Sequence, residues 1–178
     1  MRASLVCAAG LLALAAATPA SALTTIFFTG LSSAGEPVPT STATGAAIVT
    51  FDDAANTVTV QIAFQGLANA SPFGHIHCCT AVPLTGSVGV ALSFTAFPAV
   101  ATGFYTNEFT LTPAAFSTLF AGAFDGKAYV NIHTPGLYGG GEIRGFLPAV
   151  PEPGTYALML GGLGALGWAV RRRRAATA

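Results

Sequence analysis

Strict alternation of polar and apolar residues over positions 57–64 is the feature of this chain that most constrains its fold. Residues two apart on a strand share a face, so the apolar half of this segment would pack inward while the polar half meets water. That pattern is typical of a half-buried antiparallel strand. The connection 52–56, Asp-Asp-Ala-Ala-Asn, separates it from a second apolar segment, 46–51, which predicts a β-hairpin. The inward-facing residues would be Val58, Val60, Ile62 and Phe64.

Six further segments have the composition of short strands and are separated by turn residues, at the spacing of a mostly β sandwich or barrel. These segments are 24–29, 74–78, 88–94, 103–111, 127–133 and 142–147. One short helix is predicted over 113–121. Thr112 can cap it, Pro113 suits its first position, and Gly122 can end it.

The first 22 residues have the three parts of a secretory signal peptide. Arg2 supplies a positive start, residues 5–17 are small and apolar, and Ala20 and Ala22 form an A-x-A cleavage pattern. Cleavage by signal peptidase after Ala22 is expected. An uncleaved N-terminal anchor is the alternative, but the apolar stretch is short for one. We therefore predict that the chain is exported.

The other end of the chain has a Pro-rich linker at 148–154, an apolar segment at 155–170 and a basic tail at 171–178. As a helix the apolar segment would be about 24 Å long, slightly short for a bilayer core of about 30 Å. Consecutive arginines do not cross a membrane easily, so the tail should stay in the cytoplasm and the rest of the chain outside it. We therefore predict a transmembrane helix over 155–170.

The order of these parts resembles the PEP-CTERM sorting signal of exopolysaccharide-producing Gram-negative bacteria. The resemblance is carried by a Pro-Glu-Pro motif, the Gly-rich segment 158–168 and a terminal arginine cluster. The residues are Pro151, Glu152 and Pro153, and Arg171, Arg172, Arg173 and Arg174. The resemblance implies an exosortase that cleaves near the motif after transient residence in the inner membrane. The domain would then reach the cell envelope or extracellular matrix. A permanent single-pass anchor is the alternative.

Removing both terminal segments leaves about 128 residues, which is the length of one domain. This core has two basic and six acidic residues, a formal charge of −4. It has no basic patch, so nucleic acid is not an expected partner. The core also lacks a nucleophile elbow, a P-loop and an H-E-x-x-H motif. These features favour a non-enzymatic role.

All three histidines of the chain fall in two predicted strands. His75 and His77 are two apart and would share a face, and His133 ends another strand. This spacing suits one transition-metal ion, such as copper, zinc or iron, with a carboxylate or a thiol as a further ligand. The alternative needs no metal, because the three rings could instead bond to Glu142 and Arg144.

Cys78 and Cys79 are the only thiols left once Cys7 departs with the signal peptide. In an oxidising envelope this adjacent pair could form a vicinal disulfide, whose unfavourable geometry makes it easily reduced. On a regular strand Cys79 shares the face of His75 and His77, so ligation of a metal by Cys79 is a second possibility. An intermolecular disulfide, or a pair of ordinary turn or core residues, are the others.

Glu142 and Arg144 are also two apart on a predicted strand and would share a face. We expect an ion pair between them, or between one of them and a neighbouring strand. If partly buried, such a pair would contribute more to the specificity of the fold than to its stability.

Successive blocks of the core resemble a CHRD domain, which is named for chordin and whose bacterial members are secreted. The match runs from about residue 24 to residue 147. Its specific part is Asn-x-His-Thr at 131–134 followed by Gly-Glu-Ile-Arg-Gly at 141–145. The resemblance implies a single immunoglobulin-like or Cu,Zn superoxide dismutase-like antiparallel β-sandwich with one short helix. A His-x-His strand binds copper in that dismutase, but this chain lacks its later histidines and C-terminal cysteine, so we expect no dismutase activity.

Two hypotheses for function follow. The first is a non-enzymatic domain of the cell envelope or of a biofilm's exopolysaccharide matrix, binding polysaccharide or envelope protein through loops such as 80–86 and 134–141. The second is a metal-binding or redox domain built on the His-x-His strand.

Overall fold

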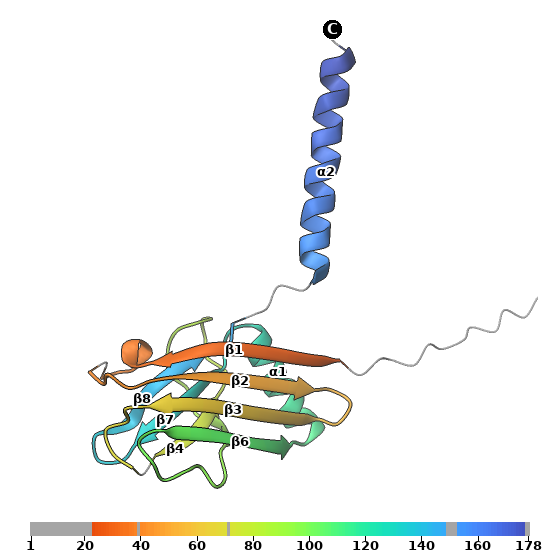
Figure 1. The fold of residues 1–178 in the computed structure, drawn as a ribbon. Coiled ribbons are helices and arrows are strands. Elements are labelled where there is room, and N and C mark those ends of the chain that lie inside the picture. Colours follow the sequence, from red (N-terminus) through yellow and green to blue (C-terminus); the bar gives the residue numbers. More distant parts are fainter. Residues whose placement is uncertain (1–22, 39, 71, 149–152, 177–178) are drawn as a thin grey trace, which may run out of the picture.

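A computed structural model describes the chain apart from residues 1–22, 39, 71, 149–152 and 177–178 (Figure 1). The predicted signal peptide and its cleavage residues Ala20 and Ala22 lie outside the described residues, as do Pro151 and Glu152 of the sorting motif. The described chain is mostly β, as expected.

Eight strands form one antiparallel sheet with the order β5-β4-β7-β8-β1-β2-β3-β6 (Figure 1). They are β1 (Thr24–Ser32), β2 (Thr44–Asp52), β3 (Thr57–Gln65), β4 (Phe73–His77), β5 (Val90–Ser93), β6 (Gly103–Thr110), β7 (Tyr129–Thr134) and β8 (Tyr138–Phe146). The helical elements are η1 (Ser33–Gly35), α1 (Pro113–Phe124) and α2 (Pro153–Ala176). Every predicted strand is present, with ends shifted by a few residues.

The predicted hairpin is formed by β2 and β3, with Val49 opposite Val60. All four residues predicted to face inward from β3 are buried. A carboxylate oxygen of Asp52 accepts the backbone N–H groups of Ala54 and Ala55 at 3.0 and 3.1 Å, which stabilises the turn. The alternating pattern therefore predicted both the strand and the face that it buries.

The two halves of the sheet, β5-β4-β7-β8 and β1-β2-β3-β6, join where β8 meets β1, at the register pair Ser32–Arg144. Inward-facing side chains of both halves nevertheless belong to one hydrophobic cluster, which includes Phe27 of β1 and Ile132 of β7. The strands thus form one continuous sheet that surrounds a shared core. The immunoglobulin-like or dismutase-like sandwich stays a prediction.

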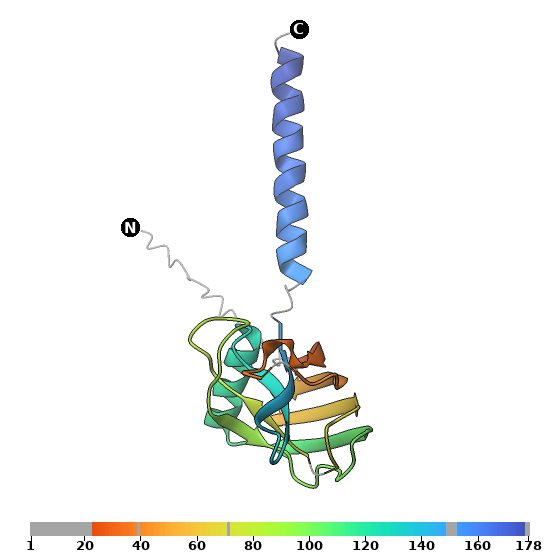
Figure 2. The same ribbon diagram turned by 90° about the vertical axis from the view of Figure 1, so that its left-hand side faces the viewer.

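Helix α1 covers the open side of this core (Figure 2). Thr112 Oγ1 accepts the backbone N–H of Ala115 at 3.3 Å, and Pro113 occupies the first turn, as predicted. Phe116 packs edge-on against Phe51 of β2, with ring centroids 5.8 Å apart. The helix continues past the predicted end at Gly122, which is buried within it.

Helix α2 runs as 24 residues through the apolar segment and into the arginine cluster (Figure 1). The expectation of a transmembrane helix over 155–170 is not met. Among the described residues, no helix combines the length and the apolar character needed to cross a membrane. The apolar run is short and passes directly into four arginines.

Candidate metal centre

One face of β4 and β7 carries all three histidines. The residues opposed across these strands are Phe73 with His133, His75 with Asn131, and His77 with Tyr129. Because alternate residues of a strand share a face, these six side chains lie on the same side of the sheet. The residues between them, such as Ile76 and Val130, point to the hydrophobic core on the other side. The core thus fixes the face on which the histidines stand.

The three imidazole rings converge. One nitrogen of each ring lies within 4.8 Å of the others, and Nε2 of His77 is 3.3 Å from Nε2 of His133. His77 and His133 reach toward each other across the row that contains His75 and Asn131. Three nitrogen donors this close are the donor set that transition metals such as zinc and copper prefer, so these residues fit such an ion.

Backbone carbonyls orient two of the rings. Nδ1 of His77 lies 2.7 Å from the carbonyl oxygen of Val88, and Nδ1 of His133 lies 3.1 Å from that of Gly139. A carbonyl can only accept, so each Nδ1 carries the hydrogen and donates it. In the neutral rings both Nε2 atoms are then unprotonated. Their lone pairs are directed into the same space, as in metal sites whose ligands are oriented by outer hydrogen bonds.

The third ring is less constrained. His75 is half-buried, and its Nδ1 is buried with no hydrogen-bond partner among the described residues. Phe73 flanks the cluster, with its ring centroid 5.9 Å from that of His75 and 5.8 Å from that of His133. Because Phe73 is 43% exposed, solvent approaches the histidines from this side.

Burial keeps the histidines neutral. It lowers the pKa of His133 to about 4, against the hydrogen bond to Gly139, while the other two histidines and Arg144 lower that pKa further. Burial also lowers the pKa of His75, with a smaller contribution from His77. It lowers the pKa of His77 as well, opposed mainly by the hydrogen bond to Val88. Neutral imidazole is the form that binds a metal ion.

A second layer of side chains supports the cluster. The ring of Tyr129 stacks on His77, with centroids 4.8 Å apart and an interplanar angle of 1°. The guanidinium carbon of Arg144 lies 4.6 Å from the centroid of the Tyr129 ring. Arg144 also bonds Glu36 at 2.5 Å, and both side chains are almost fully buried. This stack fixes the plane of His77.

Of the two ion pairs expected, the one between Glu142 and Arg144 does not form, and Arg144 pairs instead with a residue from a neighbouring segment. Arg144 pairs with Glu36, which follows η1, and donates to the carbonyl of Gly86 at 3.0 Å. Glu142 accepts three hydrogen bonds and makes no ion pair among the described residues. Its donors are the Ser41 hydroxyl at 2.7 Å, the backbone N–H of Ala68 at 2.9 Å and the Thr134 hydroxyl. Neither residue bonds a histidine, so the hydrogen bonds that were the metal-free alternative do not form.

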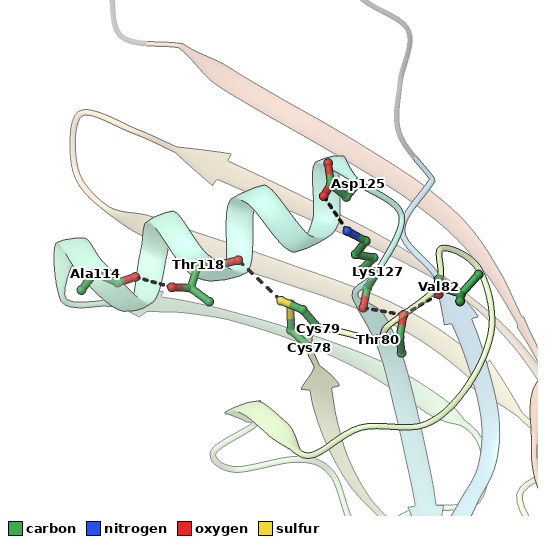
Figure 3. Close-up of a disulfide and its surroundings, with 8 residues drawn as sticks. All are labelled: Cys78, Cys79, Thr80, Val82, Ala114, Thr118, Asp125 and Lys127. Atoms are coloured by element: carbon green, nitrogen blue, oxygen red, sulfur yellow. Dashed lines mark hydrogen bonds and ion pairs between the residues drawn. A yellow bond between two sulfur atoms is a disulfide. The ribbon is translucent and has the colours of Figure 1, made fainter.

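Cys78 and Cys79 form a disulfide with each other, immediately after β4 (Figure 3). Their sulfur atoms lie against α1, where a side chain at Gly122 would overlap both, and Cys79 Sγ is 3.7 Å from the carbonyl oxygen of Thr118. Cys79 therefore does not join the histidines. The alternation that predicted a shared face ends with β4 at His77.

Sequence reasoning missed several residues of this layer. Tyr129 and Asn131 were detectable, because they alternate with His133 on the same strand. Glu36 was not, because 108 positions separate it from Arg144 and no local pattern links them. The roles of the backbone carbonyls of Val88 and Gly139 could not be predicted either, because every residue has such a carbonyl whatever its side chain.

Two family models match the chain. The CHRD domain matches residues 27–147, which is more than half of the chain. The PEP-CTERM protein-sorting motif matches residues 149–174. The first match ends and the second begins around the Pro-rich linker. No curated protein and no solved structure matches the chain.

Proposed function

This chain belongs to the CHRD domain family and carries a PEP-CTERM protein-sorting motif, and from its histidine cluster we propose that it is a non-enzymatic metal-binding domain of the cell envelope or exopolysaccharide matrix. His75, His77 and His133 would hold one transition-metal ion. The sorting motif implies processing by an exosortase-type enzyme and supports an extracellular, envelope-associated location.

The separation of 3.3 Å between the Nε2 atoms of His77 and His133 carries the proposal. Two nitrogen ligands at about 2.0–2.1 Å from a tetrahedral ion lie about 3.3–3.4 Å apart. Both Nδ1 atoms already donate to carbonyls, so no proton of the neutral rings lies between the two Nε2 atoms. The lone pairs of the two Nε2 atoms therefore face each other, and a metal ion between them would form a bond with each. Rotation of His75, whose Nδ1 has no hydrogen bond to break, would supply the third.

The donor set favours zinc or copper among the metals considered. Three imidazoles and no carboxylate do not suit calcium or magnesium, which prefer oxygen. Non-haem iron sites commonly add a carboxylate to two histidines. Both oxygens of Glu142, the carboxylate on the strand β8 that pairs with β7, already accept hydrogen bonds. The chain would therefore bind zinc or copper more tightly than iron.

Elemental analysis of the exported protein tests the proposal. The wild-type chain is expected to carry about one equivalent of zinc or copper, and a His75→Ala/His77→Ala variant none. Gln61→Ala, an exposed position on β3, is the matched control and should retain the metal. A folded wild-type chain that binds neither metal, even after incubation with excess ion, would contradict the proposal.

A further inference from the structure

The Cys78–Cys79 disulfide is a chemically reactive group that the proposed metal site does not use. It follows β4 and packs against Gly122 of α1, where an added Cβ would overlap both sulfurs. Its two residues differ in their surroundings. Cys78 is half-buried and packs against the hydrophobic core, whereas Cys79 is exposed. Because thiol–disulfide exchange depends on access to a sulfur atom, Cys79 is the residue that an attacking thiolate can reach.

A groove beside the disulfide provides this access. It has a volume of about 460 Å³, and the disulfide forms part of its lining. The other lining residues are mostly small and belong to β5 and α1: Ala91, Ala114, Ala115, Thr118 and Leu119. No lining residue that the structure describes is charged, so an anionic thiolate meets no charge repulsion there. A small thiol, or an exposed cysteine of another protein, can therefore approach Cys79 through this groove.

The surroundings of Cys79 also suit the reduced form. Cys79 Sγ lies 3.7 Å from the carbonyl oxygen of Thr118 on α1 (Figure 3). A disulfide sulfur carries no hydrogen, so this contact becomes a weak S–H···O hydrogen bond only after reduction. The Thr118 hydroxyl does not compete for this carbonyl, because it donates to the carbonyl of Ala114 at 3.0 Å. The reduced pair would thus gain a hydrogen bond that the disulfide cannot make.

We infer that Cys78 and Cys79 form a thiol–disulfide exchange site whose substrate is a dithiol carried by another molecule. After losing its proton to water, one thiol of the substrate bonds to Cys79 Sγ. The Cys78–Cys79 bond breaks, and its electron pair passes to Cys78 Sγ, which takes up a proton from water. The second thiol of the substrate also loses its proton to water and attacks the substrate sulfur bound to Cys79. The substrate thereby closes its own disulfide and releases Cys79, which takes up a proton.

Two electrons and two protons thus pass from the dithiol to the protein. This site goes beyond the proposed metal centre and does not depend on it, because neither sulfur joins the histidines.

The test follows reduction of the exported chain by dithiothreitol, measured by alkylating the released thiols and counting them by mass spectrometry. A disulfide that reacts only after global unfolding is reduced at least about 10³-fold more slowly in the native chain than in the denaturant-unfolded chain. Here the native rate is expected to lie less than about a hundredfold below the unfolded rate, because Cys79 is exposed in the folded domain. A larger difference would overturn the inference.

Ala115→Phe tests the groove as the route to Cys79. Ala115 is an exposed lining residue, so a phenyl ring there should slow native reduction about tenfold while leaving the unfolded rate unchanged. Ser117→Phe, at an exposed position of α1 outside the groove lining, is the matched control and should react as wild type. Equal native rates for the two variants would overturn the assignment of the groove. If Ala115→Phe does not fold, the comparison of native and unfolded wild-type chains decides the inference.

Discussion

Lowering the pH should destabilise the metal-free domain through His133. In the unfolded chain this histidine takes up its proton near pH 6.5, whereas burial holds its pKa at about 4 in the folded state. The unfolded state therefore binds the proton first as the pH falls. The contribution of neutral His133 to stability is present above pH 6.5 and is lost progressively down to about pH 4.

The magnitude follows from that interval. Each pH unit over which only the unfolded chain binds the proton costs about 1.4 kcal/mol. From pH 6.5 to about 4 the loss in the free energy of unfolding is about 3 kcal/mol for His133 alone. His75 and His77 add to it, because their pKa values are lowered too.

Denaturant unfolding of chelator-treated protein between pH 7 and pH 4 measures this loss. Carboxylates also titrate in this range, so the informative quantity is the difference between wild type and His133→Gln, which cannot take up the proton. The wild type should lose about 3 kcal/mol more than the variant over this range. Parallel curves for the two proteins would refute the reasoning, because they would mean that folding does not restrict protonation of His133.

Three further outcomes are expected. Zn²⁺ at one hundred times its dissociation constant should raise the free energy of unfolding by about 2.7 kcal/mol in a thermal melt, and chelation should reverse this. Arg144→Met should cost about 3–5 kcal/mol in denaturant unfolding by leaving Glu36 charged and buried, and a simultaneous Glu36→Leu should recover much of it. Gly122→Ala should destabilise by about 1–3 kcal/mol despite the helix propensity of alanine, because its Cβ would overlap the disulfide sulfurs. Gly140→Ala, with no atom within 4 Å of the added Cβ, should change stability by less than about 0.5 kcal/mol.

Local patterns predicted the elements of this fold because each element has a local cause. Alternation over 57–64 requires one buried face on a strand, and β3 buries that face. Thr112 and Pro113 satisfy the first turn of a helix wherever the helix packs, and α1 begins there. The shared face of His75 and His77 has the same origin, since it depends only on the two residues being in β4.

Contacts between distant segments were beyond such reasoning. Arg144 was expected to pair with Glu142 or with a neighbouring strand, and the sequence could not name Glu36, which the segment after β1 brings to it. Hydroxyl and backbone donors from three other segments satisfy Glu142 instead. Strand alternation could not predict the position of Cys79, because β4 ends at His77 and the disulfide lies against α1. A buried polar group usually has a hydrogen-bond partner, but its burial does not specify which residue supplies it.

The proposed metal site would also affect the stability of the domain. Each buried polar atom without a partner costs about 1–3 kcal/mol, and in the described chain all such atoms belong to His75, Asn131, Arg144 and Glu36. A metal ion bound through Nδ1 of His75 would remove this cost for that atom. Apolar side chains in place of the histidines would make the metal-free domain more stable, but they could not bind an ion. If the proposed site is correct, the metal-free domain is therefore less stable than the metal-bound one at His75.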